Sequence, residues 1–302
     1  MRLNPQAMIN SRIGVALALG LGRITPPKIG YLLARFAADR ISGRRNWGLV
    51  QAVRVNQWVV SQKKLSGPEL DQAVQVTFRN QARFLFDLYH HLDDAANMDA
   101  RIIFSPQCEQ IIRRSQHQKE GTVVVGVHTG NFDFVMQTAA RCGLRALTLA
   151  APETGGGYHW QNEIRRRQGL EIIPASMASL REATDRLNAG RTVLTGIDRP
   201  QPGSKYRPMF FGCPAAVPVL HIYLALKAKV PVIVVAAIQH PDRVYEIMAS
   251  DPIEMQPHPD RHTEIIQNAE TVLNVAAEFI RMAPQQWSMF YPVWPDVQAE
   301  LP

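Results

Sequence analysis

From residue 121 onward the chain alternates short apolar runs with segments whose apolar residues recur at helical spacing. The expected strands are Thr122–Val127, Ala146–Ala150, Glu171–Pro174, Thr192–Ile197, Val230–Ile238 and Val244–Ala249. The expected helices are Asn131–Arg141, Tyr158–Gln168, Met177–Asn188, Val219–Ala228 and His262–Met282. Strands that alternate with helices build a sheet that is parallel in its centre and covered by helices. The sequence therefore predicts an α/β fold with a mostly parallel central sheet flanked by helices.

The N-terminal fifth of the chain is far more basic than the remainder. Residues 1–64 contain 11 lysines and arginines against a single acid, Asp39, whereas the rest of the chain contains 22 basic and 25 acidic residues. This asymmetry predicts an anionic partner, either nucleic acid or the surface of a membrane that carries anionic lipid.

Apolar residues in the same segment favour the membrane. Ile13–Gly22 is a ten-residue apolar run, and Ile29–Ile41 has apolar residues at helical spacing. Ten residues are too few to cross a bilayer, which takes about 20, but helices with an apolar and a basic face lie among lipid headgroups. We therefore predict that an amphipathic helical region, residues 1–65, binds an anionic membrane surface, and that nucleic acid is not a partner. The alternative is a helix packed on its own domain with a solvated basic face.

A second region, residues 66–302, is expected to form the main domain. Ser66-Gly67-Pro68-Glu69 has the pattern of a capping box with proline near the first helical position, which predicts that a helix starts there. The residues of this helix that are expected to face the core are Leu70, Val74, Phe78, Leu85 and Leu88.

His128 and Asp133 are the strongest candidates for chemistry. His128 directly follows the strand Thr122–Val127, and Asp133 lies five residues further on, in the first turn of the next helix. A carboxylate there can accept a hydrogen bond from one ring nitrogen and leave the other nitrogen free to take a proton from a hydroxyl. Among nine histidines and 26 acidic residues, about one such spacing is expected by chance, so a structural histidine at the strand end is the alternative.

A second carboxylate is expected at the same edge of the sheet. Asp198-Arg199 follows the strand Thr192–Ile197, and the carboxyl ends of parallel strands lie together. Asp198 is therefore a candidate to bind an acceptor sugar hydroxyl or to orient a catalytic group. A turn aspartate before Pro200 is the alternative.

Further candidates for substrate binding lie on a loop and on a helix. The loop Gln201–Pro218 contains Arg207 and the pair Phe210 and Phe211, which fit the wall of an apolar channel or ordinary core packing. On the helix Tyr158–Gln168, Arg165 and Arg166 are candidates to meet a phosphate, although a solvated helix face is the more frequent outcome.

Several functions with well-known sequence signatures are not supported. The chain has no GxGxxG, GxSxG, HExxH or CxxC pattern and no P-loop. Cys108, Cys142 and Cys213 are odd in number, which predicts a reducing compartment, no disulfide framework and no zinc site.

In their order along the chain, these features resemble the bacterial lipid acyltransferases that carry a His-x4-Asp/Glu motif. The similarity is greatest to the late lipid A acyltransferases and the phosphatidylinositol mannoside acyltransferases. It covers the basic N-terminus, Phe78–Tyr89, His128–Asp133, Arg165–Gly169, Asp198-Arg199, Phe210-Phe211-Gly212, and the tail with Gln286-Trp287, Tyr291 and Trp294-Pro295.

The resemblance implies an enzyme that moves a fatty acyl chain from a thioester to a hydroxyl of a glycolipid or lysolipid. The co-substrate would be acyl-CoA or acyl-carrier protein, with no cofactor and no metal. His128 would be the general base and Asp133 would orient it, while an arginine of Arg165–Arg167 would meet a phosphate and Phe210 and Phe211 would flank the acyl chain. The resemblance also implies peripheral or monotopic attachment to the cytoplasmic face of the inner membrane.

Two points go beyond the resemblance or stay open within it. Backbone N–H groups at the start of the helix, around Gly130 and Asn131, are our own candidates to bind a developing oxyanion. The N-terminal apolar run is shorter than the transmembrane helix of many lipid A acyltransferases, which leaves the acceptor open. A thioester hydrolase, in which His128 activates water, and a lipid-binding protein without turnover are the alternative functions.

Overall fold

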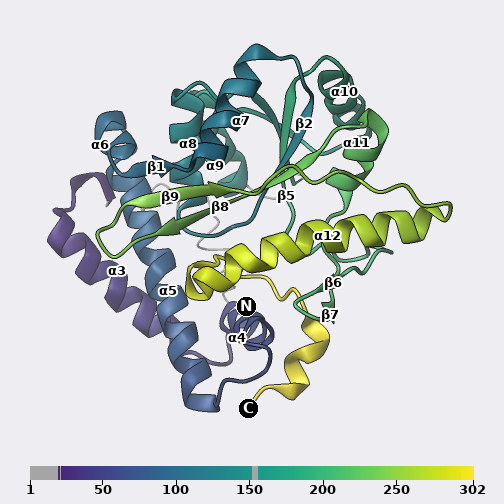
Figure 1. The fold of residues 1–302 in the computed structure, drawn as a ribbon. Coiled ribbons are helices and arrows are strands. Elements are labelled where there is room, and N and C mark those ends of the chain that lie inside the picture. Colours follow the sequence, from purple (N-terminus) through teal and green to yellow (C-terminus); the bar gives the residue numbers. More distant parts are fainter. Residues whose placement is uncertain (1–19, 21, 152–155) are drawn as a thin grey trace.

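A seven-stranded sheet forms the centre of the protein in the computed structural model, which describes residues 20, 22–151 and 156–302 (Figure 1). In spatial order the strands are β1 (Ile102–Phe104), β9 (Tyr245–Ala249), β8 (Val232–Gln239), β2 (Thr122–Gly126), β5 (Thr192–Gly196), β3 (Ala146–Ala150) and β4 (Glu171–Pro174). All neighbours pair in parallel except β8 and β9. The predicted α/β fold with a mostly parallel sheet is therefore confirmed.

Helices cover both faces of this sheet. Val123 and Val125 of β2 pack with α10 (Met177–Asn188), α11 (Leu220–Ala228) and α12 (Arg261–Met282). Val124, which points to the opposite face, packs with α7 (Pro106–His117) and α8 (Phe132–Arg141). Successive side chains of a strand point to opposite faces of the sheet. Since both faces are buried here, β2 carries apolar side chains in succession at Val123, Val124 and Val125. α9 (Gly156–Arg167) contacts β4 at the far edge.

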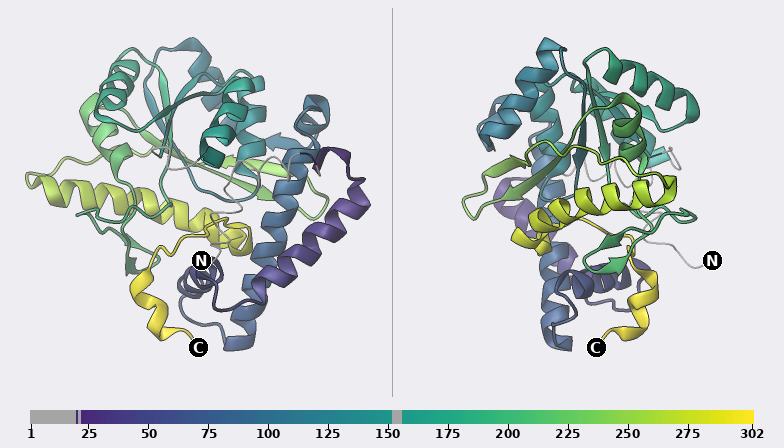
Figure 2. Two further views of the ribbon diagram at one scale, coloured as in Figure 1. Left: turned by 180° about the vertical axis from the view of Figure 1, so that it is seen from behind. Right: turned by 45° about the vertical axis from the view of Figure 1, so that its right-hand side comes forward.

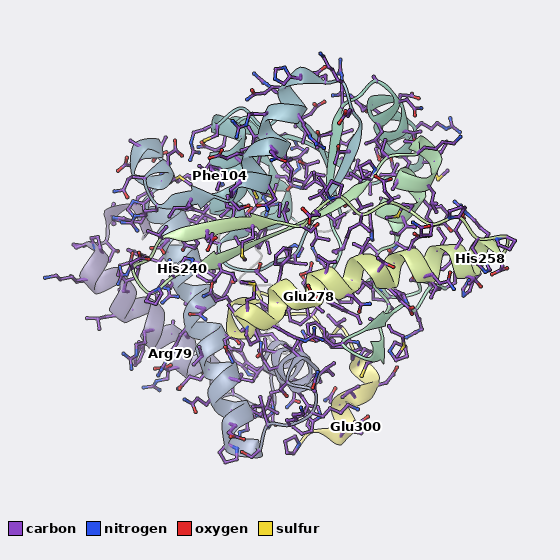
Figure 3. The ribbon with its side chains drawn as sticks, viewed as in Figure 1. Arg79, Phe104, His240, His258, Glu278 and Glu300 are labelled. Atoms are coloured by element: carbon purple, nitrogen blue, oxygen red, sulfur yellow. The ribbon has the colours of Figure 1, made fainter. Side chains whose placement is uncertain are left out.

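In the described part of the chain, the long helices α3 (Pro27–Ser42), α4 (Gly48–Val60) and α5 (Gly67–His90) come before the sheet. Figures 1 and 2 show α3 lying along α5 at the outside of the molecule. Arg79, labelled in Figure 3, projects from α5, and its Nε lies 2.5 Å from Asp39 Oδ1 on α3. The predicted capping box is present at the start of α5, where Ser66 N–H donates to Glu69 Oε2 at 2.7 Å. Val55, Val59 and Val60 of α4 belong to the main core.

The helix expected at Ile29–Ile41 is α3, and one of its faces is apolar and exposed. Ile29, Leu32, Leu33 and Phe36 recur at helical spacing and are 51 to 67% exposed, whereas Gly30, Ala38 and Ser42 face inward. The apolar run expected at residues 13–22 falls, apart from Gly20 and Gly22, outside the described residues. None of the helices in the described part is both long and apolar enough to cross a membrane. The division at residue 65 stays a prediction.

The remaining elements are short and lie mostly in loops. They are α6 (Ala95–Asp99), the hairpin of β6 (Met209–Phe210) and β7 (Cys213–Pro214), and the 3-10 turns η1 (Pro284–Gln286) and η2 (Pro295–Glu300). η1 follows α12 and brings the next residues of the chain back beneath the carboxyl ends of the central strands. Thr129 and Trp287 form an isolated antiparallel bridge there, and Ser288 N–H donates to His128 O at 2.7 Å.

Candidate active site

His128 and Asp198 come together because their strands pair in register. β2 and β5 are adjacent, Gly126 is paired with Gly196, and each of the two functional residues lies two positions beyond its glycine. The ring Nδ1 of His128 lies 2.6 Å from Asp198 Oδ1. The backbone N–H of His128 donates to Asp198 Oδ2 at 2.8 Å, so the carboxylate holds both the ring and the main chain of the histidine.

The Asp198 carboxylate is fully buried and accepts a third hydrogen bond. The indole Nε1–H of Trp287 donates to Asp198 Oδ2 at 2.7 Å. Burial alone raises the pKa of a carboxyl group, but the charge of the His128 ring and the three hydrogen bonds outweigh it and hold the pKa of Asp198 below its ordinary value. The group at this position is therefore an ionised aspartate rather than a neutral acid.

His128 has the properties of a base that is held in one orientation. Its burial lowers the pKa of the imidazole, but the adjacent Asp198 charge and hydrogen bond outweigh this and raise the pKa above its ordinary value of 6.5. The side chain is 27% exposed, and in the described part of the protein its second nitrogen, Nε2, carries no hydrogen bond. Because Nδ1 faces a carboxylate, the neutral ring carries its proton there and offers a lone pair at Nε2.

Two neighbouring residues, Phe132 and Gly196, pack against the imidazole of His128. The Phe132 ring meets the His128 ring edge-on, with centroids 4.6 Å apart. On the other side, a Cβ added to Gly196 would lie 3.2 Å from His128 Cε1, which is closer than ordinary van der Waals contact. Glycine at the end of β5 therefore leaves room for the ring.

The sequence-based pairing of Asp133 with His128 is wrong in this structure, since Asp198 occupies that place. Asp133 instead accepts two hydrogen bonds from Arg165, at 2.5 Å from Nε and 3.0 Å from Nη2. Its side chain points from the first turn of α8 toward α9 rather than back toward the strand end. Arg165, expected to meet a phosphate, is thus held by Asp133 and also by Asn162 Oδ1 at 2.8 Å. Asp133 still acts on His128 through its charge, which helps to raise the pKa of the imidazole.

The pair of Asp133 and Arg165 is part of a partly buried polar group beside the histidine. The two side chains are 17% and 12% exposed. Burial raises the pKa of Tyr89 to about 12, and the Asp133 charge adds to the rise. The tyrosine therefore stays neutral, and α5, α8 and α9 meet at this point.

Of the backbone N–H groups that follow His128, some donate a hydrogen bond and others do not. Gly130 has a φ of +57° and donates its N–H to Gln286 O at 3.0 Å, so that group would have to leave Gln286 before it could bind an oxyanion. A Cβ at Gly130 would lie 2.7 Å from Ala237 O, which explains the glycine. Within the described residues, the N–H groups of Asn131, Phe132 and Asp133 carry no hydrogen bond, and they stand at the start of α8.

The Asn131 side chain is structural in this arrangement. It is buried, its Nδ2 donates to Phe84 O at 2.7 Å, and its Oδ1 caps α8 by accepting from Phe134 N–H at 3.4 Å. It therefore ties the start of α8 to α5.

The other predicted substrate-binding residues make contacts of a different kind. Arg166 donates to Ile172 O at 3.2 Å and lies 3.8 Å from Glu163, and Arg207 is exposed on its loop. Phe210 is fully buried, with its ring centroid 4.8 Å from Phe211, which is half-buried. Their predicted roles toward phosphate and acyl chain stay predictions.

Trp287 is the contact that sequence reasoning did not assign. It lies 89 residues beyond Asp198, and nothing in its local pattern indicates that its indole meets a carboxylate. Its ring belongs to a buried aromatic cluster with Phe210, Phe211 and Trp294, at centroid distances of 6.2, 6.4 and 6.2 Å. For metals, the described residues contain no group of three or more histidine, cysteine or acidic side chains arranged as ligands.

The fold and these contacts define an α/β protein with a histidine–aspartate pair at the carboxyl edge of its parallel strands. The sequence model of the bacterial lipid A biosynthesis acyltransferase family matches residues 15–295. The chain therefore belongs to this family and is an acyltransferase of the lipid A type, which implies a lipid acceptor and an acyl donor. A search of curated proteins gave no match.

Proposed function

We propose that this protein transfers a fatty acyl chain from acyl-CoA or acyl-carrier protein to a hydroxyl of a glycolipid or lysolipid, with His128 as the general base. The single observation that carries the mechanism is the 2.6 Å contact between His128 Nδ1 and the buried Asp198 carboxylate. This contact fixes the ring and leaves Nε2 as the proton acceptor. The family gives the reaction type, and this geometry supports the proposal that His128 is the base.

The proposed reaction runs by direct transfer. The Nε2 atom of His128 takes the proton of the acceptor hydroxyl as its oxygen attacks the thioester carbonyl carbon. The resulting tetrahedral intermediate carries its negative charge on the former carbonyl oxygen. Its C–S bond then breaks, and the leaving thiolate takes the proton from Nε2, which yields an ester and a free thiol. Asp198 stabilises the imidazolium that exists between the two proton transfers.

The start of α8 is the candidate for stabilising the tetrahedral intermediate. The N–H groups of Asn131, Phe132 and Asp133 have no partner within the described residues, and the positive end of the helix dipole lies there. In this proposal the oxyanion meets these groups rather than the N–H of Gly130. Asp133 contributes by charge and by holding Arg165, not by orienting the ring.

The proposed attachment to the membrane uses α3. Its exposed apolar residues Ile29, Leu32, Leu33 and Phe36 would enter the headgroup region, and its neighbouring basic residues would meet anionic lipid. Arg40 and Arg44 are exposed and lie over the rings of Phe36 and Trp47, at 4.9 and 4.3 Å. The proposed location is the cytoplasmic face of the inner membrane.

The direct test measures thiol release from palmitoyl-CoA and from palmitoyl-acyl-carrier protein by the wild type and by His128→Ala. Each donor is supplied with and without a total polar-lipid extract, and the lipid product is identified by mass spectrometry. We expect release that requires the lipid extract and is lost in His128→Ala. His117→Ala, on the exposed end of α7, is a matched control that should keep full activity.

Other results would exclude parts of the proposal. Thiol release that does not need the lipid extract identifies a hydrolase, in which His128 activates water. Lipid-dependent release that survives in His128→Ala excludes this histidine as the base. Absence of release with both donors, from protein that binds vesicles, favours lipid binding without turnover.

A further inference from the structure

The indole of Trp287 is placed to control the base without touching a substrate. Its Nε1–H donates to Asp198 Oδ2 at 2.7 Å, on the carboxylate oxygen that also accepts from the His128 backbone. The other oxygen, Oδ1, is thereby left to face the His128 ring at 2.6 Å. Trp287 is 1% exposed and Asp198 is fully buried, so bulk solvent does not compete with the indole for this carboxylate.

The aromatic cluster holds the indole in that orientation. Phe210 meets Trp287 edge-on at 86°, and Trp294 and Phe211 pack on it at tilted angles of 59° and 36°. The backbone of Trp287 is fixed as well, since it bridges Thr129, the residue after His128. The three ring contacts and the backbone bridge together fix the position of the N–H that donates to Asp198.

We propose that Trp287 is a positioning residue for the acyl transfer: its indole N–H holds the Asp198 carboxylate so that Oδ1 faces the His128 ring. This inference rests on the proposed function, because it assigns to Trp287 the orientation of the base used there. Because Trp287 is buried and donates to Asp198, it would act through Asp198 and His128 rather than by contact with a substrate.

The physical consequence concerns the protonation of the pair. The Trp287 donor stabilises the carboxylate most strongly when the neighbouring imidazole is neutral, since the negative charge is then uncompensated. Removing the Trp287 donor therefore favours the state in which the His128 imidazole is protonated, which raises the pKa of His128. The fall of kcat on the acid side should then occur at higher pH. The charged groups that act on His128 are Asp198, Arg199 and Asp133, and all of them remain in the variant.

The test compares Trp287→Phe with Trp294→Phe. Both changes shorten a buried tryptophan of the same cluster, but the Nε1 of Trp294 donates to Cys213 O at 3.3 Å and not to Asp198. In Trp287→Phe we expect kcat to fall about ten- to a hundredfold, which is the weight of one hydrogen bond to a charged group, with KM changed less than about threefold. The acid limb of kcat should rise by about half a pH unit or more. Trp294→Phe should keep the pH profile.

An equal loss of kcat in both variants, with an unshifted acid limb in Trp287→Phe, would overturn the proposal and leave Trp287 a packing residue. If Trp287→Phe does not fold, 3-benzothienylalanine at position 287 keeps the shape of the indole and lacks only the N–H. NMR titration of the His128 ring gives a readout independent of activity. A titration midpoint that rises in the position-287 variant supports the inference even if the wild type fails the acyl-transfer assay, and an unchanged midpoint overturns it.

Discussion

Replacing Asp198 by asparagine removes one negative charge while keeping the shape of the side chain. The native carboxylate accepts from the His128 ring, the His128 backbone N–H and the Trp287 indole. An asparagine accepts only at its single oxygen, so its amide nitrogen must turn toward one of these donors. If the nitrogen faces the ring, Nδ1 must become an acceptor, and the proton moves to Nε2, where the base is needed.

The expected loss of kcat in Asp198→Asn has two sources, the lost ionic hydrogen bond and the change of the His128 tautomer. The ionic contribution of the bond to the ring is worth about 1.5–3 kcal/mol, and the unfavourable tautomer adds a further cost. Together these predict a loss of about 3–5 kcal/mol of transition-state stabilisation, or roughly 10²- to 10⁴-fold in kcat. KM should change little, since Asp198 is fully buried and does not meet the substrate. Without the adjacent charge, burial dominates and the pKa of His128 falls below 6.5.

The assay is thiol release from the better acyl donor in the presence of lipid extract, followed over pH with thermal unfolding in parallel. Asp87→Asn is the matched control, because Asp87 is also fully buried and accepts from Tyr31 and Tyr245 hydroxyls at 2.6 and 2.9 Å. The control should lose stability and keep the pH profile. If folded Asp198→Asn protein retains kcat within about threefold of the wild type, the pair is not the catalytic base system.

Four further predictions test separate parts of the structure. The wild-type kcat/KM should fall on the acid side with a midpoint above pH 6.5, because the base must be neutral and its pKa is raised; a midpoint below 6.5 contradicts this. Arg165→Gln leaves the Asp133 charge unpaired and should lower the free energy of unfolding in urea by about 3 kcal/mol, whereas Arg167→Gln, on an exposed residue, should cost less than about 0.5 kcal/mol. Gly196→Ala places a Cβ 3.2 Å from the His128 ring and should reduce kcat about tenfold, while Gly67→Ala, which meets open space, should not. The double change Leu32→Ser and Leu33→Ser should weaken sedimentation with anionic vesicles, and equal binding by this variant and by Ile103→Ser, a control on β1, would exclude α3 as the attachment site.

The central part of the fold could be predicted from sequence because its signals are local. Glu171–Pro174, Ala146–Ala150 and Met177–Asn188 were predicted with the bounds that the structure has. The strand β1 was not predicted, since its three residues, Ile102–Phe104, become a strand only through pairing with β9. The same holds for the two-residue strands of the β6–β7 hairpin.

The candidate site could be predicted only in part, because its contacts depend on distant segments. The placement of Asp198 at the edge of the sheet that carries His128 followed from strand order, and orienting a catalytic group was one of its two predicted roles. That Asp198 rather than Asp133 contacts the His128 ring depends on two features that the sequence does not show. They are the pairing of Gly126 with Gly196 and the direction in which the first turn of α8 points Asp133. The Trp287 contact required the return of the chain after α12, for which the sequence carries no local signal.

The spacing of His128 and Asp198 is set by the hydrogen-bonded ladder of two adjacent strands rather than by the loop between them. The two residues lie 70 positions apart in sequence. Apart from β5 itself, the described chain between them contains β3, β4, α8, α9, α10 and their connections, and none of these fixes this distance. Changes in the length of those connections can therefore leave the contact between His128 and Asp198 in place. In a protein built in this way, the loops around the pair can vary in length and sequence while the geometry of the pair is kept.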